Sequence, residues 1–114
     1  LNLKGMISQR LLPRENAKGR VAVIEIMLNS PLISDMIFKG EVGEIKEVMK
    51  RSRDIGMQTF DQALFDAFEE GTISYQDALR NADSQNDLRL QIKLHSQRAA
   101  TTDLSAGTEH LAVL

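Results

Sequence analysis

Apolar and polar residues follow two different patterns along this chain, and the pattern changes after its first quarter. Residues 8–12 and 20–28 are short apolar stretches on either side of the polar loop 13–19, which predicts a β-hairpin with a long connection. The apolar spacing within residues 3–7 predicts the last turns of a helix. Two strands alone are marginally stable in water, so we expect the hairpin to lie against helices or against a sheet that this chain does not contain.

After the hairpin, the spacing of apolar residues becomes helical, with one apolar stripe in each segment. Four capping signals open predicted helices: a Ser or Thr stands just before Pro, or three residues before an acidic or amide side chain. The signals are Ser30 with Pro31, Thr59 with Gln62, Ser74 with Asp77, and Ser84 with Asp87. Gly40, Gly56 and Gly71 are predicted to end helices. The second helix, over residues 42–55, has an inward stripe that begins at Val42.

The last apolar segment, residues 88–94, alternates strictly, so its period also fits a strand. The capping signal before it and its Leu, Arg, Gln and Lys residues favour a fifth helix over about 88–97. Residues 99–114 are small and polar, which predicts a flexible, disordered tail. The predicted fold class is therefore α+β and mostly α, with a helix turn and hairpin in 1–28, a bundle of short helices in 29–98, and the tail.

Composition narrows the classes of function. The chain has 114 residues, no cysteine, a formal charge of −2 and a pI near 5.7. This length suits one modest domain, and the charge provides no basic field for nucleic acid. Without cysteine there are no disulfides, zinc thiolate sites or thiol catalysis, and the cytoplasm is the expected compartment. No apolar run approaches the roughly 20 residues of a membrane helix. The start at Leu1, without Met or a signal peptide, predicts a fragment of a longer protein.

Motifs for chemistry are absent from the sequence. It contains no Gly-rich phosphate loop ending in Lys-Ser or Lys-Thr, no dinucleotide fingerprint, no Gly-x-Ser-x-Gly elbow and no His-Glu-x-x-His helix. His95 and His110 are too far apart in sequence to share a metal ion, and the second lies in the predicted tail. The sequence therefore predicts no catalytic, cofactor or metal site in this chain.

Glu25 interrupts the apolar run of the second predicted strand. The β-branched residues around it, Val21, Val23, Ile24 and Ile26, fall on both faces, as expected for a strand covered on each side. A carboxylate in such a run is paired with a base, exposed at an edge or tuned for function. We interpret Glu25 as a salt-bridge partner of a basic neighbour. The alternative is a functional role at a site that residues outside this chain complete.

Residues 40–43 (GEVG) have the spacing of the loop with which KH modules clamp RNA. The acidic side chains of Glu41 and Glu44 would repel phosphate there. We therefore interpret Gly40 as a helix stop and Gly43 as an ordinary helix residue. A free-standing helical interaction module or a KH-like RNA-binding module remains the alternative function.

Several local strings follow one another in a specific combination. They are residues 7–12 (ISQRLL), 19–22 (GRVA), 25–27 (EIM), 56–61 (GMQTFD), 70–74 (EGTIS) and 77–79 (DAL). Together they resemble the C-terminal segment of PilT/PilU-type type IV pilus retraction ATPases, over about residues 1–97. Residues 78–84 (ALRNADS) and the extended helix after them resemble the PilU-like branch.

The resemblance implies that the hairpin is the end of a RecA-like ATPase core. It also implies that the motifs for ATP and Mg²⁺ lie before this chain, so the chain alone should not hydrolyse ATP. Such proteins form cytoplasmic hexamers that withdraw pilin subunits from the fibre. A sister retraction ATPase and the inner-membrane pilus platform protein are the implied partners, at the inner face of the cytoplasmic membrane, and nucleic acid is not among them. Without the core, we expect apolar hairpin faces to pair between chains as a dimer or a swapped assembly.

A motif of the form AIRNLIRE, associated with retraction in PilT-like members, aligns with residues 32–39 (LISDMIFK). Its apolar positions are kept here and its polar positions differ, so the resemblance implies an accessory motor that works beside a PilT-like one. The candidate functional or partner surface consists of Glu25, Ile33, Met36, Ile37 and Lys39.

Overall fold

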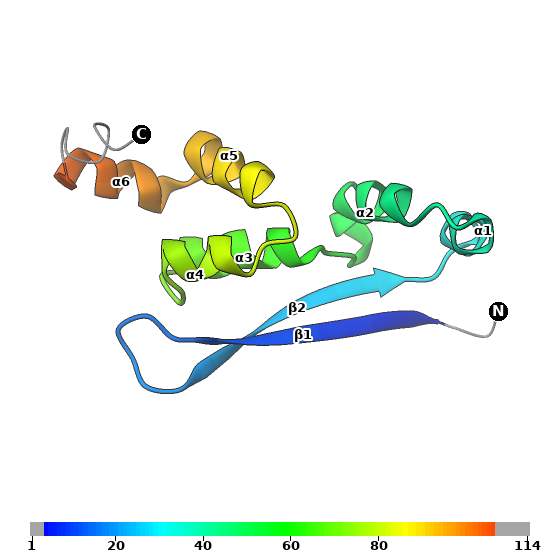
Figure 1. Ribbon diagram of the computed structural model, residues 1–114, viewed down its shortest axis with the longest axis horizontal. Helices are drawn as coiled ribbons and strands as arrows, with labels where there is room; N and C mark the ends of the chain where they lie inside the picture. The colour runs from blue at the N-terminus through cyan, green and yellow to red at the C-terminus, as the bar shows by residue number, and fades with distance from the viewer. Residues whose placement is uncertain (1–3, 107–114) are drawn as a thin grey trace.

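The computed structural model describes residues 4–106, with side chains placed through residue 101. It measures 52 × 29 × 22 Å, and its helices lie on one side of a hairpin that runs along its length (Figure 1). The elements in chain order are β1 Gly5–Pro13, β2 Arg20–Leu28, α1 Pro31–Lys39, α2 Val42–Lys50, a 3-10 turn Arg53–Ile55, α3 Phe60–Glu69, α4 Tyr75–Arg80, α5 Gln85–His95 and α6 Gln97–Ala106. The predicted fold class, a hairpin followed by short helices, is confirmed. Over residues 4–106, no helix is both long and apolar enough to cross a membrane.

The two strands pair in antiparallel register over nine residues each. The hairpin prediction is confirmed, but the helical turn predicted within residues 3–7 is wrong in its described part. Met6 and Ile7 lie in β1, opposite Met27 and Ile26 of β2. Cross-strand pairing of apolar side chains stabilises a long strand here, whereas an isolated helical turn has a costly nucleus.

The hairpin has one covered face and one open face. On the covered face, Val23 is 2% exposed and Met27 is 9% exposed under the helices. On the other face, Ile7 is 74% exposed and Leu11 is 55% exposed. The expectation of a strand covered on both sides is therefore met on one face within the described chain.

The four predicted capping signals are confirmed, because each N-cap hydroxyl accepts the backbone N–H three residues on. Thr59 and Gln62 form the reciprocal capping box. The segment whose period also fitted a strand is helical, as α5. Gly40 ends α1 with a φ of 74°, a left-handed conformation that glycine adopts without a steric penalty.

The second predicted helix is divided. α2 ends at Lys50, and the chain makes a 3-10 turn before Gly56. The reason lies just beyond the turn, where Gln58 pairs with Ile26 at the outer edge of β2 and the helix cannot continue. Val42, predicted to face inward, is 66% exposed because the buried face of α2 begins at the next turn.

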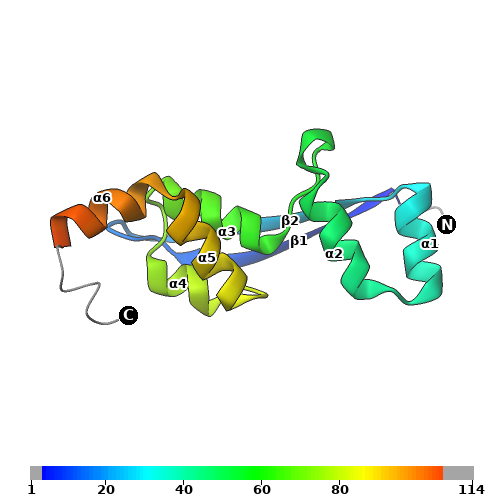
Figure 2. The ribbon, with the colours of Figure 1, turned by 90° about the horizontal axis from the view of Figure 1, so that it is seen from above.

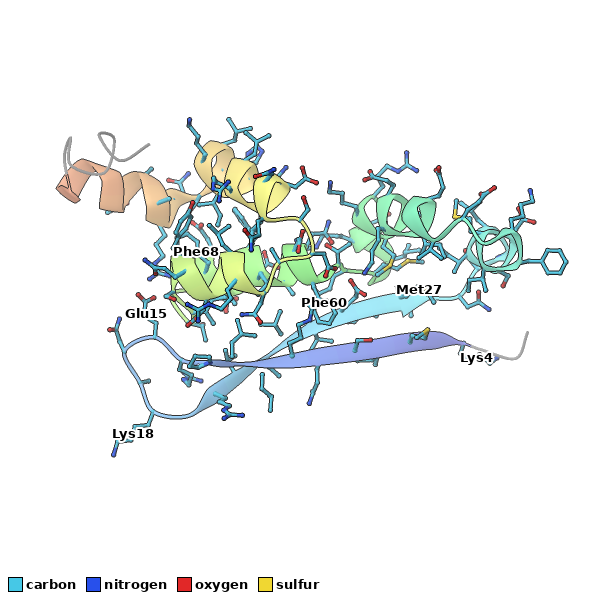
Figure 3. The ribbon with its side chains drawn as sticks, in the orientation of Figure 1. Lys4, Glu15, Lys18, Met27, Phe60 and Phe68 are labelled. Atoms are coloured by element: carbon cyan, nitrogen blue, oxygen red, sulfur yellow. The ribbon has the colours of Figure 1, made fainter. Side chains whose placement is uncertain are left out.

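Buried side chains form two clusters at opposite ends of the hairpin. The loop-end cluster contains Leu12, Val23, Phe60, Ala63, Leu64, Phe68, Ile73, Ala78, Leu88 and Ile92. The open-end cluster contains Met27, Ile33, Ile45, Val48, Met49 and Met57. Figure 2 shows α1 and α2 over one end of the hairpin and α3 to α6 over the other, and Figure 3 shows Phe60 and Met27 between the strands and the helices. The clusters share no residue.

Helix α6 begins where the sequence predicted the approach to a flexible tail. The Glu69 carboxylate accepts the hydroxyl of Ser96 at 2.6 Å and the N–H groups of Gln97 at 2.8 Å and Arg98 at 3.2 Å. A carboxylate from α3 therefore caps the N-terminus of α6, which favours the helix. α6 therefore continues the helical part of the chain past residue 98, where the sequence placed the start of the tail, and residues 107–114 lie outside the described residues.

Candidate functional site

Glu25 lies in the middle of β2, on the face that the helices cover, and its side chain is 14% exposed. Lys46 of α2 donates to both carboxylate oxygens, at 2.7 and 2.6 Å. The backbone N–H of Phe60, the first residue of α3, donates to the same carboxylate at 3.1 Å. A negative charge at a helix N-terminus is favourable. The predicted salt bridge of Glu25 is therefore confirmed, and the carboxylate joins β2, α2 and α3.

Arg10 of β1 projects from the same face of the hairpin. Its guanidinium donates to the backbone oxygen of Asn81 and to the Asp83 carboxylate at 3.1 Å. The guanidinium carbon lies 3.9 Å above the centre of the Phe60 ring, within the range of a cation–π contact. Asp83 also lies 3.5 Å from Lys46. The turn between α4 and α5 is thereby tied to the hairpin and to α2.

Asp61, in the first turn of α3, binds the turn between α4 and α5. Its carboxylate accepts the backbone N–H of Asp83 at 2.8 Å and that of Ser84 at 3.1 Å. Burial raises the pKa of Asp61, and the negative charges of Asp83 and Asp87 add to the rise, while the two N–H donors oppose it. We call Arg10, Glu25, Lys46, Asp61 and Asp83 the charged junction.

The energies of these contacts differ with their exposure. Arg10, Asp83 and Lys46 are each about two-fifths exposed in the ion pairs that involve Asp83, so each such pair contributes about 0–1 kcal/mol. Glu25 is nearly buried, and removing its partner would leave a carboxylate poorly solvated. Through these contacts the junction positions β2, α2, α3 and the turn before α5 relative to one another.

A groove of about 540 Å³ adjoins the junction, between α2, α3 and α5. Phe65 and Leu88 are among its apolar lining residues, and Lys50 and Asp87 are among its charged ones. His95, at the end of α5, also lines the groove and is exposed. Over residues 4–106, no cluster of three or more His, Cys, Asp or Glu side chains could hold a metal ion. His110 lies outside the described residues.

The candidate partner surface of α1 is split by the fold. Ile33 is fully buried and Met36 is partly buried against the open-end cluster, so Ile33 supports the packing of α1 and cannot itself touch a partner. Ile37 is 38% exposed, and Lys39 forms an exposed ion pair with Asp35 at 3.1 Å. Within the described residues, Glu25 makes its hydrogen bonds and ion pair with α2 and α3, away from α1.

Sequence reasoning missed several residues of the junction and of the α1 surface. Phe38 is 90% exposed, which is unusual for a large aromatic side chain. For Arg10, a signal was present, because the period of the strand places it on the same face as Leu12. For Lys46 and Asp83, no local pattern distinguishes them from ordinary surface residues.

The Gly40–Gly43 spacing does not form a clamp of the KH kind. Gly40 ends α1, and Gly43 lies inside α2. Glu41 and Glu44 are both exposed beside it. The interpretation as a helix stop followed by a helix residue is confirmed, and the arrangement gives no support to phosphate binding.

Comparison with known proteins identifies relatives along almost the whole chain. No family model matches it. The chain is 55% identical to the type IV pilus ATPase PilU of Pseudomonas aeruginosa over 113 residues, which is 99% of this chain and 29% of that protein. It is 33% identical to the type IV pilus retraction ATPase PilT of the same organism over 71% of this chain. It is 32% identical to a twitching motility protein of Neisseria gonorrhoeae over 76% of this chain. The chain spans less than a third of the length of each of these relatives, 29%, 23% and 23%.

Proposed function

Because the chain belongs, by sequence, to the family of the type IV pilus ATPases PilU and PilT, we propose that it is the C-terminal region of a motor ATPase that powers or assists pilus retraction and twitching motility. In this proposal the longer protein binds ATP and Mg²⁺ in a RecA-like core outside the present chain and assembles as a cytoplasmic hexamer. A sister retraction ATPase and the inner-membrane pilus platform protein are the proposed partners, and the protein acts at the inner face of the cytoplasmic membrane.

The observation that carries the proposal is the unsatisfied side of the hairpin. Its open face presents the exposed apolar side chains of Ile7, Leu11 and Leu28. Exposed apolar side chains on one face of a sheet indicate a surface that another part of a protein covers. The chain covers 29% of PilU, so a longer relative has ample polypeptide to supply that cover.

The free edge of β1 supports the same conclusion. Asn29 donates to Lys4, and Arg14 to Gly19, at the two ends of the ladder. In an antiparallel pair, the N–H and C=O groups of successive residues point alternately towards the partner strand and away from it. The groups of even-numbered β1 residues therefore point towards β2, and those of odd-numbered residues point away from it. The described sheet has β1 at an edge, so the outward groups of Ile7, Gln9 and Leu11 are available to a further strand.

Amide hydrogen exchange tests this attachment residue by residue. In the present chain, the outward N–H groups of Ile7, Gln9 and Leu11 should exchange quickly, whereas those of Ser8 and Arg10 should be protected by the ladder. In the longer protein, both sets should be protected, because a core strand or sheet covers the edge. Fast exchange at the outward positions of the folded longer protein would show that the hairpin edge stays free.

The helices are proposed to supply contacts to subunits or partners. Deletion of residues 30–97 from the longer protein should abolish pilus retraction while its upstream part still binds ATP. Phe38→Ala in the longer protein tests the exposed end of α1, with Ile55→Ala as a matched control because Ile55 is also well exposed, at 58%. Retraction that persists at the parental rate after deletion of residues 30–97 would contradict the proposed role of the helices.

Two measurements on the isolated chain complete the test. Calorimetry should detect no binding of ATP with Mg²⁺, because the chain lacks a phosphate loop. Light scattering should detect pairs of chains that dissociate in an Ile7→Ser, Leu11→Ser variant, if open faces pack together in the absence of the core. Micromolar ATP affinity of the isolated chain would contradict the placement of nucleotide binding upstream.

A further inference from the structure

The helices divide into two bodies that rest on different parts of the hairpin. The α1–α2 body, residues 31–50, packs on the hairpin through Met27 in the open-end cluster. The α3–α6 body, residues 60–106, packs through Leu12 and Val23 in the loop-end cluster. Because no buried residue belongs to both clusters, each body keeps its own apolar packing if the two shift relative to each other.

The direct ties between the bodies are polar and exposed. Lys46 and Asp83 lie 3.5 Å apart, with side chains 43% and 40% exposed. The Gln62 side chain donates to the backbone oxygen of Lys50 at 3.0 Å, and both residues line the groove. Exposed polar contacts of this kind break and re-form at small cost. By contrast, the nearly buried Glu25 carboxylate binds both Lys46 of α2 and the backbone N–H of Phe60 at the start of α3, so both bodies are attached to the hairpin at this residue.

The groove between the bodies gives them room to move. Side chains of α2, α3 and α5 surround a space of about 540 Å³. The open-end cluster beside it contains Met27, Met49 and Met57, whose flexible thioether side chains adapt to changes in packing. The segment that joins the bodies turns at Gly56, where φ is 99°. Hinges commonly lie at such turns between elements.

We propose that the α1–α2 body rocks against the α3–α6 body, opening and closing the groove. The movement twists the two-stranded hairpin between Val23 and Met27 and bends the segment around Gly56. Two-stranded ribbons accommodate a wide range of twist, so the hairpin can follow the movement without losing its ladder. Lys46 remains bound to Glu25 throughout, and its contact with Asp83 forms in the closed arrangement and breaks in the open one. Asp83 is thus a latch between the bodies.

Pulsed electron–electron resonance between two spin labels tests the proposal on the 114-residue chain, which has no cysteine of its own. Labels at Lys50→Cys and Gln91→Cys report the distance across the groove, since both residues line it and are exposed. Labels at Gln76→Cys and Lys93→Cys provide the matched control within the α3–α6 body. We expect a wider distance distribution across the groove than within the body.

Removing the latch should shift the groove distribution towards longer distances. Asp83→Asn removes the negative charge that Lys46 contacts, and Asp77→Asn is the matched control because the Asp77–Arg80 pair lies within α4. Circular dichroism establishes that each variant is folded. If Asp83→Asn fails to fold, Arg53→Gln serves in its place, since it removes the 2.5 Å ion pair that ties the segment joining the two bodies to Asp66 of α3. A groove distribution as narrow as the control and unchanged by the latch variant would overturn the proposal.

Discussion

The two ends of the hairpin carry clusters built from different side chains. The loop-end cluster contains aromatic and branched aliphatic residues, and Leu64 and Ile73 in it are completely buried. Half of the six residues in the open-end cluster are methionines. Branched and aromatic side chains have few rotamers and pack in one arrangement, whereas methionine adapts to several. The hairpin therefore carries a rigidly packed cluster at its loop end and a more adaptable cluster at its open end.

A cavity in the loop-end cluster should have the largest effect on the stability of the protein. Leu64→Ala removes a side chain that is 0% exposed, so the free energy of unfolding should fall by about 2–5 kcal/mol. Urea denaturation followed by circular dichroism measures this change. Leu90→Ala on α5 is the control, because Leu90 is 51% exposed and its truncation should change stability by less than about 0.5 kcal/mol. Equal losses in the two variants would show that the loop-end cluster is not a tight core.

A cavity in the open-end cluster should destabilise only the α1–α2 body. Ile45→Ala should destabilise the α1–α2 body by about 2 kcal/mol, at the low end of the range for such truncations because methionine neighbours relax into the space. Amide exchange in α1 and α2 should accelerate while that in α3 stays slow. An equal acceleration of amide exchange in α3 would mean that the two clusters unfold as one unit.

The charged junction lies between the two ends, and its nearly buried pair should have an intermediate effect. Lys46→Met leaves the Glu25 carboxylate without its cation, which should lower the free energy of unfolding by about 1–3 kcal/mol. Thermal and urea denaturation measure the loss, and Lys50→Met one turn along α2 is the control. Adding Glu25→Gln to Lys46→Met should restore part of the stability, since no buried charge then remains. A double variant with a lower free energy of unfolding than Lys46→Met alone would contradict this account.

The smallest effect should be the pH dependence of α6. The hydrogen bond from Ser96 lowers the pKa of Glu69 below its ordinary 4.5. Burial opposes this effect, and the N–H groups of Arg98 and Gln97 and the charge of Arg98 lower the pKa further. The folded state therefore favours the ionised carboxylate, so its contribution is complete above about pH 4.5 and is lost as pH falls through the lowered pKa. Amide exchange at the start of α6, corrected for intrinsic pH dependence, should show this loss. Glu69→Gln should remove the dependence without changing that of α3.

Local sequence predicted those elements whose causes are local. An N-cap hydroxyl and the N–H that it binds lie three residues apart, so the starts of α1, α3, α4 and α5 were visible in the sequence. The hairpin followed from two apolar stretches around a polar loop. The helical turn predicted near the start was wrong because the strand that stabilises those residues lies some 20 positions further along. The division of the second helix likewise depends on the pairing of Gln58 with β2.

The junction was only partly predictable for the same reason. The apolar run around Glu25 showed that this carboxylate needed a partner, and the fold supplies Lys46, 21 positions away. Arg10 and Asp83 are 73 positions apart, and neither is unusual in its own neighbourhood. The cap of α6 joins Glu69 to Ser96 across 27 positions. A local signal for α6 was also present and was missed, because the Ser96 hydroxyl accepts the backbone N–H of Ala99 three residues on, at 2.9 Å.

By itself, the sequence determined the class of elements, their order, most helix starts and the kinship with pilus ATPases, because propensity, capping and motif strings depend on near neighbours. The tertiary structure alone decided which faces are covered, how far α2 and α6 extend, and that Arg10, Glu25, Lys46, Asp61 and Asp83 meet at one junction. It also separated the buried Ile33 from the exposed Phe38 on one short helix. These features depend on contacts between residues far apart in the chain, and burial changes the energy of a charge or an apolar group only once those contacts exist.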